Sequence, residues 1–134
     1  MPTTFEKLNL KSQTQILVLN APESFEKELD GLEGVQVKRQ VEKVKAIEFA
    51  LAFVTKQAEV TRLSKALAGK ARGDAILWLA YPKGTSKQYQ CEFNRDNGWN
   101  ELKKLGFDTV RAVAIDEDWS ALRFRRVEFI KSTR

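Results

Sequence analysis

The apolar run Ala75–Ala80 constrains the fold of this chain more than any other stretch. It ends abruptly at Tyr81-Pro82-Lys83, and a short, wholly apolar run of this kind is typical of a strand that is covered on both faces. Ala46–Thr55 is a second such run, and Glu48 is its one charged residue. Strands covered on both faces belong to parallel sheets, so these two runs predict a sheet between layers of helices.

The rest of the chain alternates between strand and helix patterns. Further strands are predicted over Ile16–Leu19 and Val35–Val41, and the alternating polar residues of Val35–Val41 indicate a strand near an edge. Helices are predicted over Pro22–Leu29 (ended by Gly31 and Gly34), Gln57–Ala68 (capped by Thr55 and ended by Gly69) and Asn97–Leu105 (with Trp99, Leu102 and Leu105 on one face, ended by Gly106).

The C-terminal part has a different pattern. Two strand-like runs, Thr109–Ile115 and Ala121–Ile130, are joined by a short polar connection, which predicts an antiparallel pair. The expected architecture is a single three-layer α/β domain of Rossmann type over residues 1–134, with a mostly parallel sheet and a C-terminal antiparallel hairpin. The alternative is an α+β domain with helices on one face only.

Two residue counts exclude several kinds of chemistry. The 134 residues include no histidine and one cysteine, Cys91. Catalysis by Ser-His-Asp or Cys-His pairs, histidine metal sites, cysteine zinc sites and an intrachain disulfide are therefore excluded. We predict no catalytic residue, metal or cofactor. The N-terminal residues lack a signal-peptide pattern and no apolar run could cross a membrane, so we expect a cytoplasmic protein without a membrane partner.

In parallel sheets ligands bind at the carboxyl ends of the strands, so the residues that follow the strands are the first candidates for a ligand site. Asn20-Ala21-Pro22 follows the first strand, where a dinucleotide or S-adenosylmethionine site would need a glycine-rich turn. The loop after Tyr81-Pro82 carries Lys83, Ser86 and Lys87 and could hold an anion, or it could be an ordinary solvated loop. Arg95 could join such a site, and Asp96 could cap the last helix.

The connection Asp116-Glu117-Asp118-Trp119 is the densest acidic cluster. It could bind a divalent cation or provide an acid–base pair. We favour a third interpretation, a charged hairpin turn with Trp119 packed on the core, because three nearby arginines can neutralise the cluster.

Those arginines form a basic stripe near the C-terminus. Arg123 and Arg125 should face one side of a strand and Arg126 the other. Such a stripe can contact phosphates, and it can equally protect an edge strand from unwanted pairing. With a net charge of +5, anionic partners gain some weight.

The chain resembles a short bacterial family, a domain of unknown function whose members look like trimmed Rossmann-like methyltransferases. The resemblance extends from about Leu10 to Arg126 and is carried by Asn20-Ala21-Pro22, Tyr81-Pro82-Lys83, Arg95-Asp96, and Asp116-Glu117 with Trp119-Ser120, Leu122 and Phe124. It implies a methyltransferase-like fold with an antiparallel C-terminal hairpin, and no activity. Asn20-Ala21-Pro22 departs from the glycine-rich turn of active methyltransferases and therefore argues against S-adenosylmethionine binding.

Three functions follow, in order of preference. The first is a non-catalytic binding module for a small acidic ligand or a protein partner, as a monomer or a homodimer. Aromatic residues such as Tyr89, Phe93 or Trp119 could form a symmetric interface, and each could equally belong to the core. The second is a degenerate S-adenosylmethionine-dependent methyltransferase, and the third is a weak nucleic-acid-binding protein. The ligand candidates are Asn20, Tyr81, Lys83, Ser86, Lys87, Arg95, Asp96, Asp116, Glu117 and Trp119, and the phosphate-contact candidates are Lys83, Lys87, Arg123, Arg125 and Arg126.

Overall fold

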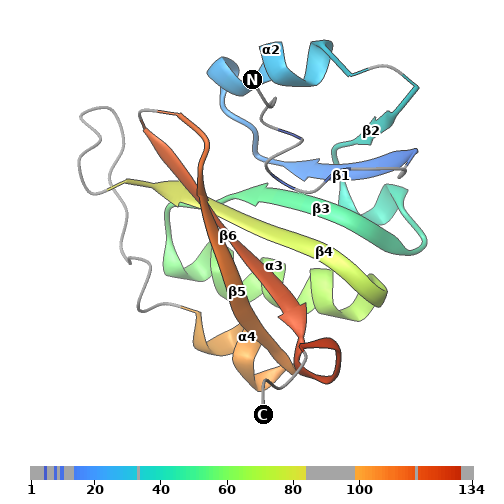
Figure 1. Cartoon of the computed structure of the whole chain (residues 1–134), viewed down its shortest axis with the longest axis vertical. Helices are drawn as coiled ribbons and strands as arrows, with labels where there is room; N and C mark the ends of the chain where they lie inside the picture. The colour runs from blue at the N-terminus through green and yellow to red at the C-terminus, as the bar shows by residue number, and fades with distance from the viewer. Residues whose placement is uncertain are drawn as a thin grey trace.

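The computed structural model describes residues 14–32, 34–83, 99–116 and 118–130, together with Phe5, Leu8 and Leu10. Within these residues six strands form one sheet in the order β2-β1-β3-β4-β6-β5 (Figure 1). Their bounds are β1 Gln15–Leu19, β2 Gln36–Lys38, β3 Ile47–Phe53, β4 Ala71–Pro82, β5 Phe107–Ala114 and β6 Trp119–Arg126. Strands β1 to β4 are parallel, and β6 is antiparallel to both β4 and β5, which confirms the predicted C-terminal hairpin.

The helices lie on both faces of this sheet. Their bounds are η1 Glu23–Phe25, α2 Glu26–Asp30, η2 Val41–Lys43, α3 Gln57–Lys70, α4 Asn100–Lys104 and η3 Val127–Phe129, where η marks a 3-10 turn. Helices α3 and α4 cover one face, and η1 with α2 lies on the other, near β1 and β2 (Figure 1). The three-layer prediction is therefore confirmed over the α+β alternative.

Both faces of the sheet bury aromatic rings. Phe25, Phe49, Phe53, Trp78 and Trp119 all lie on the face covered by α2. The cluster under α3 and α4 combines small or aliphatic residues of β3 and β4 with a second set of rings, Tyr81, Trp99, Phe107 and Phe124. Alternation along each strand assigns successive residues to opposite faces, as the double-sided apolar runs predicted.

The N-terminal segment is held onto the face covered by α2 by a buried hydrogen bond. The indole nitrogen of Trp78 donates to the carbonyl of Leu8 at 2.8 Å. Phe5 and Leu8 are both buried, and the Phe5 ring lies 5.6 Å from that of Phe25. An indole needs such an acceptor when it is buried, so Trp78 fixes the path of this segment.

Several predicted strand boundaries are wrong. The predicted strand Val35–Val41 shortens to β2, because Val41 turns into η2 and packs on the helical face. The strand Ala75–Ala80 extends in both directions to become β4, since Ala71 pairs with β3, and Tyr81 and Pro82 pair with β6. The run Ala121–Ile130 ends as a strand at Arg126 and continues as η3.

The predicted caps of α3 are also wrong. The Glu59 carboxylate, and not the Thr55 hydroxyl, satisfies the helix start by accepting from the backbone nitrogens of Thr55 (2.8 Å) and Lys56 (3.1 Å). Gly69 does not end the helix, which continues to Lys70 before β4 begins.

The last helix has a smaller buried face than predicted. Trp99 and Leu102 are buried, but Leu105 is 37% exposed because the helix ends at Lys104. Gly106 follows the end of this helix, as predicted, and its φ is 95°. Residues 97 and 98 of the predicted helix lie outside the described residues.

No helix of the described part of the chain is both long enough and apolar enough to cross a membrane.

Candidate functional site

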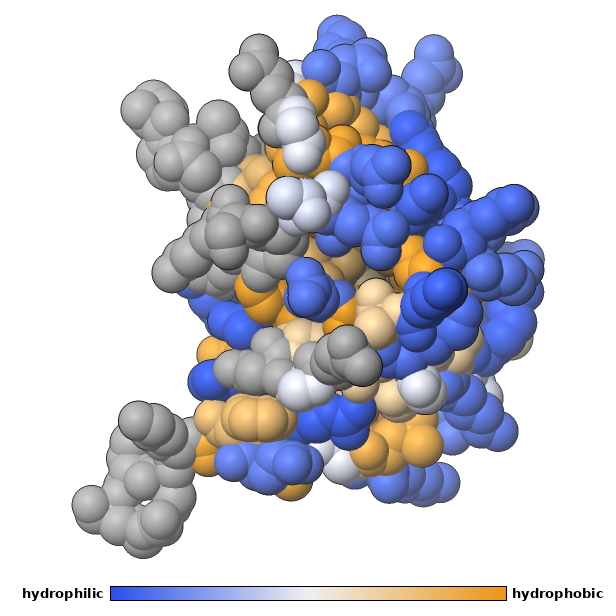
Figure 2. Space-filling model, turned by 90° about the vertical axis from the view of Figure 1, so that its right-hand side faces the viewer, coloured by the Kyte–Doolittle hydropathy of each residue, from blue (hydrophilic) through white to orange (hydrophobic). Residues whose placement is uncertain are grey.

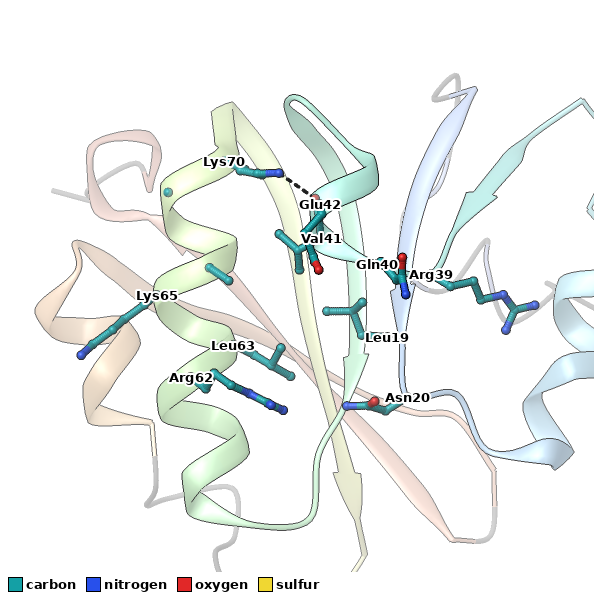
Figure 3. Close-up of a pocket in the computed structure, with 12 residues that line it drawn as sticks. Leu19, Asn20, Arg39, Gln40, Val41, Glu42, Arg62, Leu63, Lys65 and Lys70 are labelled. Atoms are coloured by element: carbon teal, nitrogen blue, oxygen red, sulfur yellow. Dashed lines mark hydrogen bonds between the residues drawn. The ribbon is translucent and has the colours of Figure 1, made fainter.

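A groove of about 830 Å³ lies on the helical face, beside α3 and over the carboxyl end of β1 (Figure 3). One wall is α3, and the other is the connection between β2 and β3. We call it the edge groove. It is lined by Leu19, Asn20, Arg39, Gln40, Val41, Glu42, Arg62, Leu63, Lys65, Ala66, Gly69 and Lys70.

The edge groove exists because one crossover is unusually short. The connection from β2 to β3 is residues 39–46, and its only regular element is the single turn η2. Parallel strands are usually joined by a dozen or more residues that form a helix. Here the connection must also pass over β1, which lies between β2 and β3 in the sheet. One 3-10 turn cannot cover the area that a helix would cover.

Two of the four cations that line the groove are held by other groups. Arg39 forms a bidentate ion pair with Glu26 at 2.6 and 2.8 Å, and its side chain points away from the groove (Figure 3). This hydrogen-bonded guanidinium lowers the pKa of Glu26. The Lys70 ammonium donates to the carbonyls of Val41 and Val44, both at 2.7 Å, and so fastens η2 to the end of α3.

Arg62 is the cation that faces the groove. Its side chain extends from α3 into the space between α3 and Asn20, whereas that of Lys65 points outward (Figure 3). Within the described residues no hydrogen bond or ion pair engages the Arg62 guanidinium. Leu19 and Leu63 form the apolar floor next to it. The groove therefore offers an available guanidinium beside an apolar floor.

A second and smaller hollow lies at the carboxyl ends of β1 and β3. We call it the crevice; its volume is about 280 Å³ and it is lined by Asn20, Pro22, Glu23, Phe53, Thr55, Glu59 and Trp119. This is where the strand order reverses direction, the usual ligand position of an open α/β sheet. The rings of Phe53 and Trp119 pack edge to face at 5.0 Å, and Glu59 already caps α3. The crevice is therefore small, and two of its seven lining residues are glutamates.

Asn20 lies between the two hollows. Its φ of 58° is left-handed, a conformation that asparagine tolerates better than most residues. Its amide nitrogen lies 3.4 Å from the Phe53 carbonyl, which ties the end of β1 to the end of β3. Of the predicted candidates, the structure brings Asn20 and Trp119 together at the crevice.

The other described ligand candidates lie elsewhere. Tyr81 is buried against Trp99, with ring centroids 5.5 Å apart, and Lys83 follows it with its backbone nitrogen donating to Asp118. Asp116 accepts through one carboxylate oxygen from the backbone nitrogens of Asp118 (2.8 Å) and Trp119 (2.9 Å), so it shapes the hairpin turn. The candidates Ser86, Lys87, Arg95, Asp96 and Glu117 lie outside the described residues, as do Tyr89 and Phe93.

Trp119 is 3% exposed, so it belongs to the core and does not present an exposed ring at a dimer interface. Among the described residues, no group of three or more carboxylate or cysteine side chains could hold a metal ion.

The basic stripe is divided between the two faces of the sheet. Arg126 lies over the Phe107 ring at 4.9 Å and donates to the Ala71 carbonyl at 2.7 Å. It therefore joins the end of β6 to the first residues of β4 and β5. Alternation along β6 assigns Arg123 and Arg125 to the opposite face, as predicted. Arg111, which the sequence did not single out, pairs in register with Arg123.

No motif in the sequence points to the edge groove. Arg62 occupies an exposed helix position and looks like any solvated charge in the sequence. One signal was available: the segment between the strand patterns at Val37 and Ile47 is too short for a crossover helix. Recognising it requires knowing that the two strands are parallel and not adjacent, which is a property of the sheet.

Comparisons with known proteins agree on the fold. A scan against protein-family models finds no match, and a search of curated proteins finds no similar sequence. Similar solved structures include a SAM-dependent methyltransferase from Aquifex aeolicus, with 15% identity, a TM-score of 0.59, and coverage of 92% of this chain and 87% of that chain. The N-methyltransferase NodS from Bradyrhizobium japonicum has 10% identity, a TM-score of 0.56, and coverage of 90% and 91%.

The mitomycin 7-O-methyltransferase MmcR is similar as well, with 9% identity, a TM-score of 0.65 and coverage of 92% of this chain. The described chain has the methyltransferase-like Rossmann fold. It spans only 53% of the length of MmcR and 54% of that of the pyocyanin biosynthetic protein PhzM. At such low identities the likeness shows the fold alone.

Proposed function

We propose that this chain is a degenerate S-adenosylmethionine-dependent methyltransferase domain that binds an anionic ligand in the edge groove and does not transfer methyl groups. The observation that carries the proposal is the groove itself, with Arg62 directed into it. Its volume of about 830 Å³ lies within the range of roughly 300–1,000 Å³ that ligand sites occupy.

Three features support the loss of the standard cofactor site. Asn20-Ala21-Pro22 replaces the glycine-rich turn, and Pro22 has no amide hydrogen to donate. The crevice, at about 280 Å³, falls below the range of roughly 300–1,000 Å³ for ligand sites. Arg39 follows β2, where Rossmann domains that bind dinucleotides place an acidic residue for the ribose.

The chemistry of the groove supports an anion as the ligand. A guanidinium binds carboxylate or phosphate through two parallel hydrogen bonds, and Arg62 has its donors available for this. Asn20 adds a side-chain amide at the same end of the groove as Arg62, and Gln40 adds another farther along the opposite wall (Figure 3). Leu19 and Leu63 can cover an apolar part of the ligand.

The test is thermal unfolding and isothermal titration with named anionic probes: ATP, coenzyme A, citrate, inorganic phosphate and poly-L-glutamate. At least one probe should stabilise the wild type and Lys104→Glu but not Arg62→Glu. Lys104 lies on α4 outside the groove, so its variant controls for the change in net charge. A ligand at about 100 times its Kd adds about 2.7 kcal/mol of stability. The absence of any Arg62-dependent binding would contradict the proposal.

Residual methyl transfer is the second candidate, and the methyltransferase neighbours favour it. It requires S-adenosylmethionine to bind near Asn20. Equilibrium dialysis with radiolabelled S-adenosylmethionine tests this directly. We expect no retention at millimolar concentration, and saturable retention that Asn20→Ala weakens would favour the enzyme instead.

A further inference from the structure

Over β1, the described residues leave one helix position on the helical face of the sheet unfilled. Six strands spaced about 4.8 Å apart span about 24 Å. Packed helices lie about 8–10 Å apart, so such a face has room for three. In the described part of the chain, α3 packs on β3 and β4, and α4 packs against β5. Of the described elements, the single turn η2 alone crosses the remaining part of the face, over β1, and this is where the edge groove lies.

We propose that the edge groove is the docking site for an amphipathic α-helix of a partner protein, and that this helix carries carboxylates along its flank. The inference rests on the proposed function and names the class of its anionic ligand. The partner helix would complete the layer that α3 and α4 begin.

The position of the groove favours a helix over an extended peptide. The edge groove lies over a face of the sheet, where side chains project. It does not run along the outer side of an edge strand, where backbone N–H and C=O groups are available for pairing. An extended segment would find no ladder of hydrogen bonds there. A helix satisfies its own backbone groups and needs only side-chain contacts, which is how amphipathic helices bind to grooves.

The shape and composition of the wall also favour a helix. Ala66 and Gly69 line the groove from α3, and a Cβ built on Gly69 would meet no atom within 4 Å. Small side chains at this wall allow a second helix axis to come close. The α3 wall from Arg62 to Lys70 extends about 12 Å at 1.5 Å per residue, which matches about two turns of a partner helix.

Charge selects the partner. The lining contains four cations, Arg39, Arg62, Lys65 and Lys70, against one carboxylate, Glu42. Arg39 and Lys70 are engaged within the chain, which leaves Arg62 to meet a carboxylate of the incoming helix. Apolar contacts on Leu63 and a carboxylate on Arg62 therefore describe an acidic amphipathic helix.

The experiment uses the full chain and a fluorescein-labelled 16-residue peptide with leucines along one helical face and glutamates on its flanks. A second peptide replaces every glutamate with lysine, and a third scrambles the order so that no apolar face forms. Anisotropy titration should show saturable binding of the first peptide, and at least about tenfold weaker binding of the other two. Circular dichroism should show a gain of helix on binding.

Variants of the chain locate the site. Arg62→Glu and Ala66→Trp should each weaken binding of the acidic peptide at least about tenfold, the first by charge and the second by filling the groove. Lys104→Glu should leave it unchanged. Ala66 is partly exposed, so the tryptophan can be accommodated, and unchanged thermal unfolding of each variant will show that it folds.

The outcomes separate this inference from the proposed function. Arg62-dependent binding of ATP, citrate or unstructured poly-L-glutamate without binding of the acidic helical peptide overturns the helix and leaves the proposed function standing. Equal binding of the lysine peptide, or binding that survives Ala66→Trp, also overturns the helix. Absence of binding by every anionic probe overturns both.

Discussion

The two hollows beside Asn20 differ in nearly every respect. The crevice occupies the usual ligand position of the fold, yet it is small. Two glutamates and the packed rings of Phe53 and Trp119 are among the residues that line it. The edge groove is about three times larger by volume, 830 against 280 Å³, and four of its twelve lining residues are cations, of which Arg62 is directed into it. The groove is bounded by η2, whose one turn replaces a crossover helix. Of these two hollows, the larger one therefore lies at the side of the sheet beside α3 and not at the strand ends.

One face of the molecule shows how hydrophilic and hydrophobic residues are distributed on its surface (Figure 2). Seen from the right-hand side of Figure 1, the molecule is largely hydrophilic, and hydrophobic residues show between the hydrophilic ones (Figure 2). Single apolar residues on a surface are ordinary, so it is the directed charge of Arg62, and not hydrophobicity alone, that distinguishes the groove.

The strongest way to break the comparison is to open the crevice. Trp119→Ala removes a ring that is 3% exposed and packed against Phe53. We expect a loss of about 3–5 kcal/mol in the free energy of unfolding, measured by urea titration. Trp119→Phe, which keeps a ring, is the matched control and should lose less. A loss under about 1 kcal/mol would show that the crevice is not closed by packing.

The next largest effect should come from the wall of the groove. Lys70→Met keeps the length of the side chain but removes the ammonium that donates to Val41 and Val44. Hydrogen bonds of charged groups contribute about 1.5–3 kcal/mol each, so we expect a loss of that order in urea unfolding. Lys65→Met, on the outer side of α3, should change stability by less than about 0.5 kcal/mol. Equal effects of the two variants would mean that η2 does not depend on Lys70.

A smaller effect should sharpen the contrast between a lined space and a filled one. Gly69→Ala adds a methyl group in the groove, where nothing lies within 4 Å. We expect a gain of about 0.5–1 kcal/mol from the lower entropy of the unfolded chain, measured by thermal unfolding. Gly106→Ala should instead be destabilising, because φ at Gly106 is 95°. If Gly69→Ala destabilises the protein, the α3 wall of the groove has no room for a methyl group at this position.

The smallest effect concerns the ion pair behind the groove. The pKa of Glu26 is lowered from its ordinary value of 4.5, chiefly by its hydrogen bond to Arg39. The folded protein therefore binds fewer protons than the unfolded chain around pH 4.5, and stability from this pair is present above that pH. It is lost as the pH falls through the lower, folded-state pKa.

The measurement compares the wild type with Glu26→Gln by thermal unfolding at several pH values. The difference in Tm should be small at pH 6, because the pair is exposed, and should shrink as the pH is lowered below 4.5 and the Glu26 carboxylate is protonated in the folded protein. A difference that stays constant with pH would show that the pair contributes no linkage.

Local patterns explain why much of the fold was predictable. Apolar runs such as Ala75–Ala80 and Ile16–Leu19 can be buried on both sides only in a covered sheet, and each became the centre of a strand. Gly106 marked a turn because its backbone is left-handed. The ends of strands were less predictable: Ala71 and Tyr81 joined β4 because β3 and β6 offered partners there.

The candidate site was less predictable for the same kind of reason. The carboxyl ends of strands were the right place to look for Asn20, since topology alone assigns them to one edge. The edge groove depends on Lys70 meeting carbonyls near Val41, 29 residues earlier in the chain. No local pattern encodes a contact between segments so far apart in the chain. Arg62 becomes a candidate site residue only because the structure directs it into the groove.

The sequence by itself determined which segments are buried on one or both sides, the parallel sheet with its C-terminal hairpin, and the absence of histidine chemistry and of a glycine-rich cofactor turn. Periodicity and composition carry that information because burial acts on each residue in turn. The tertiary structure decided that β2 and β3 lie on either side of β1, that Arg126 stacks on Phe107, and that a single turn leaves a groove beside α3. Those features depend on which distant segments meet, and contacts between segments far apart in the chain leave no periodic trace in it.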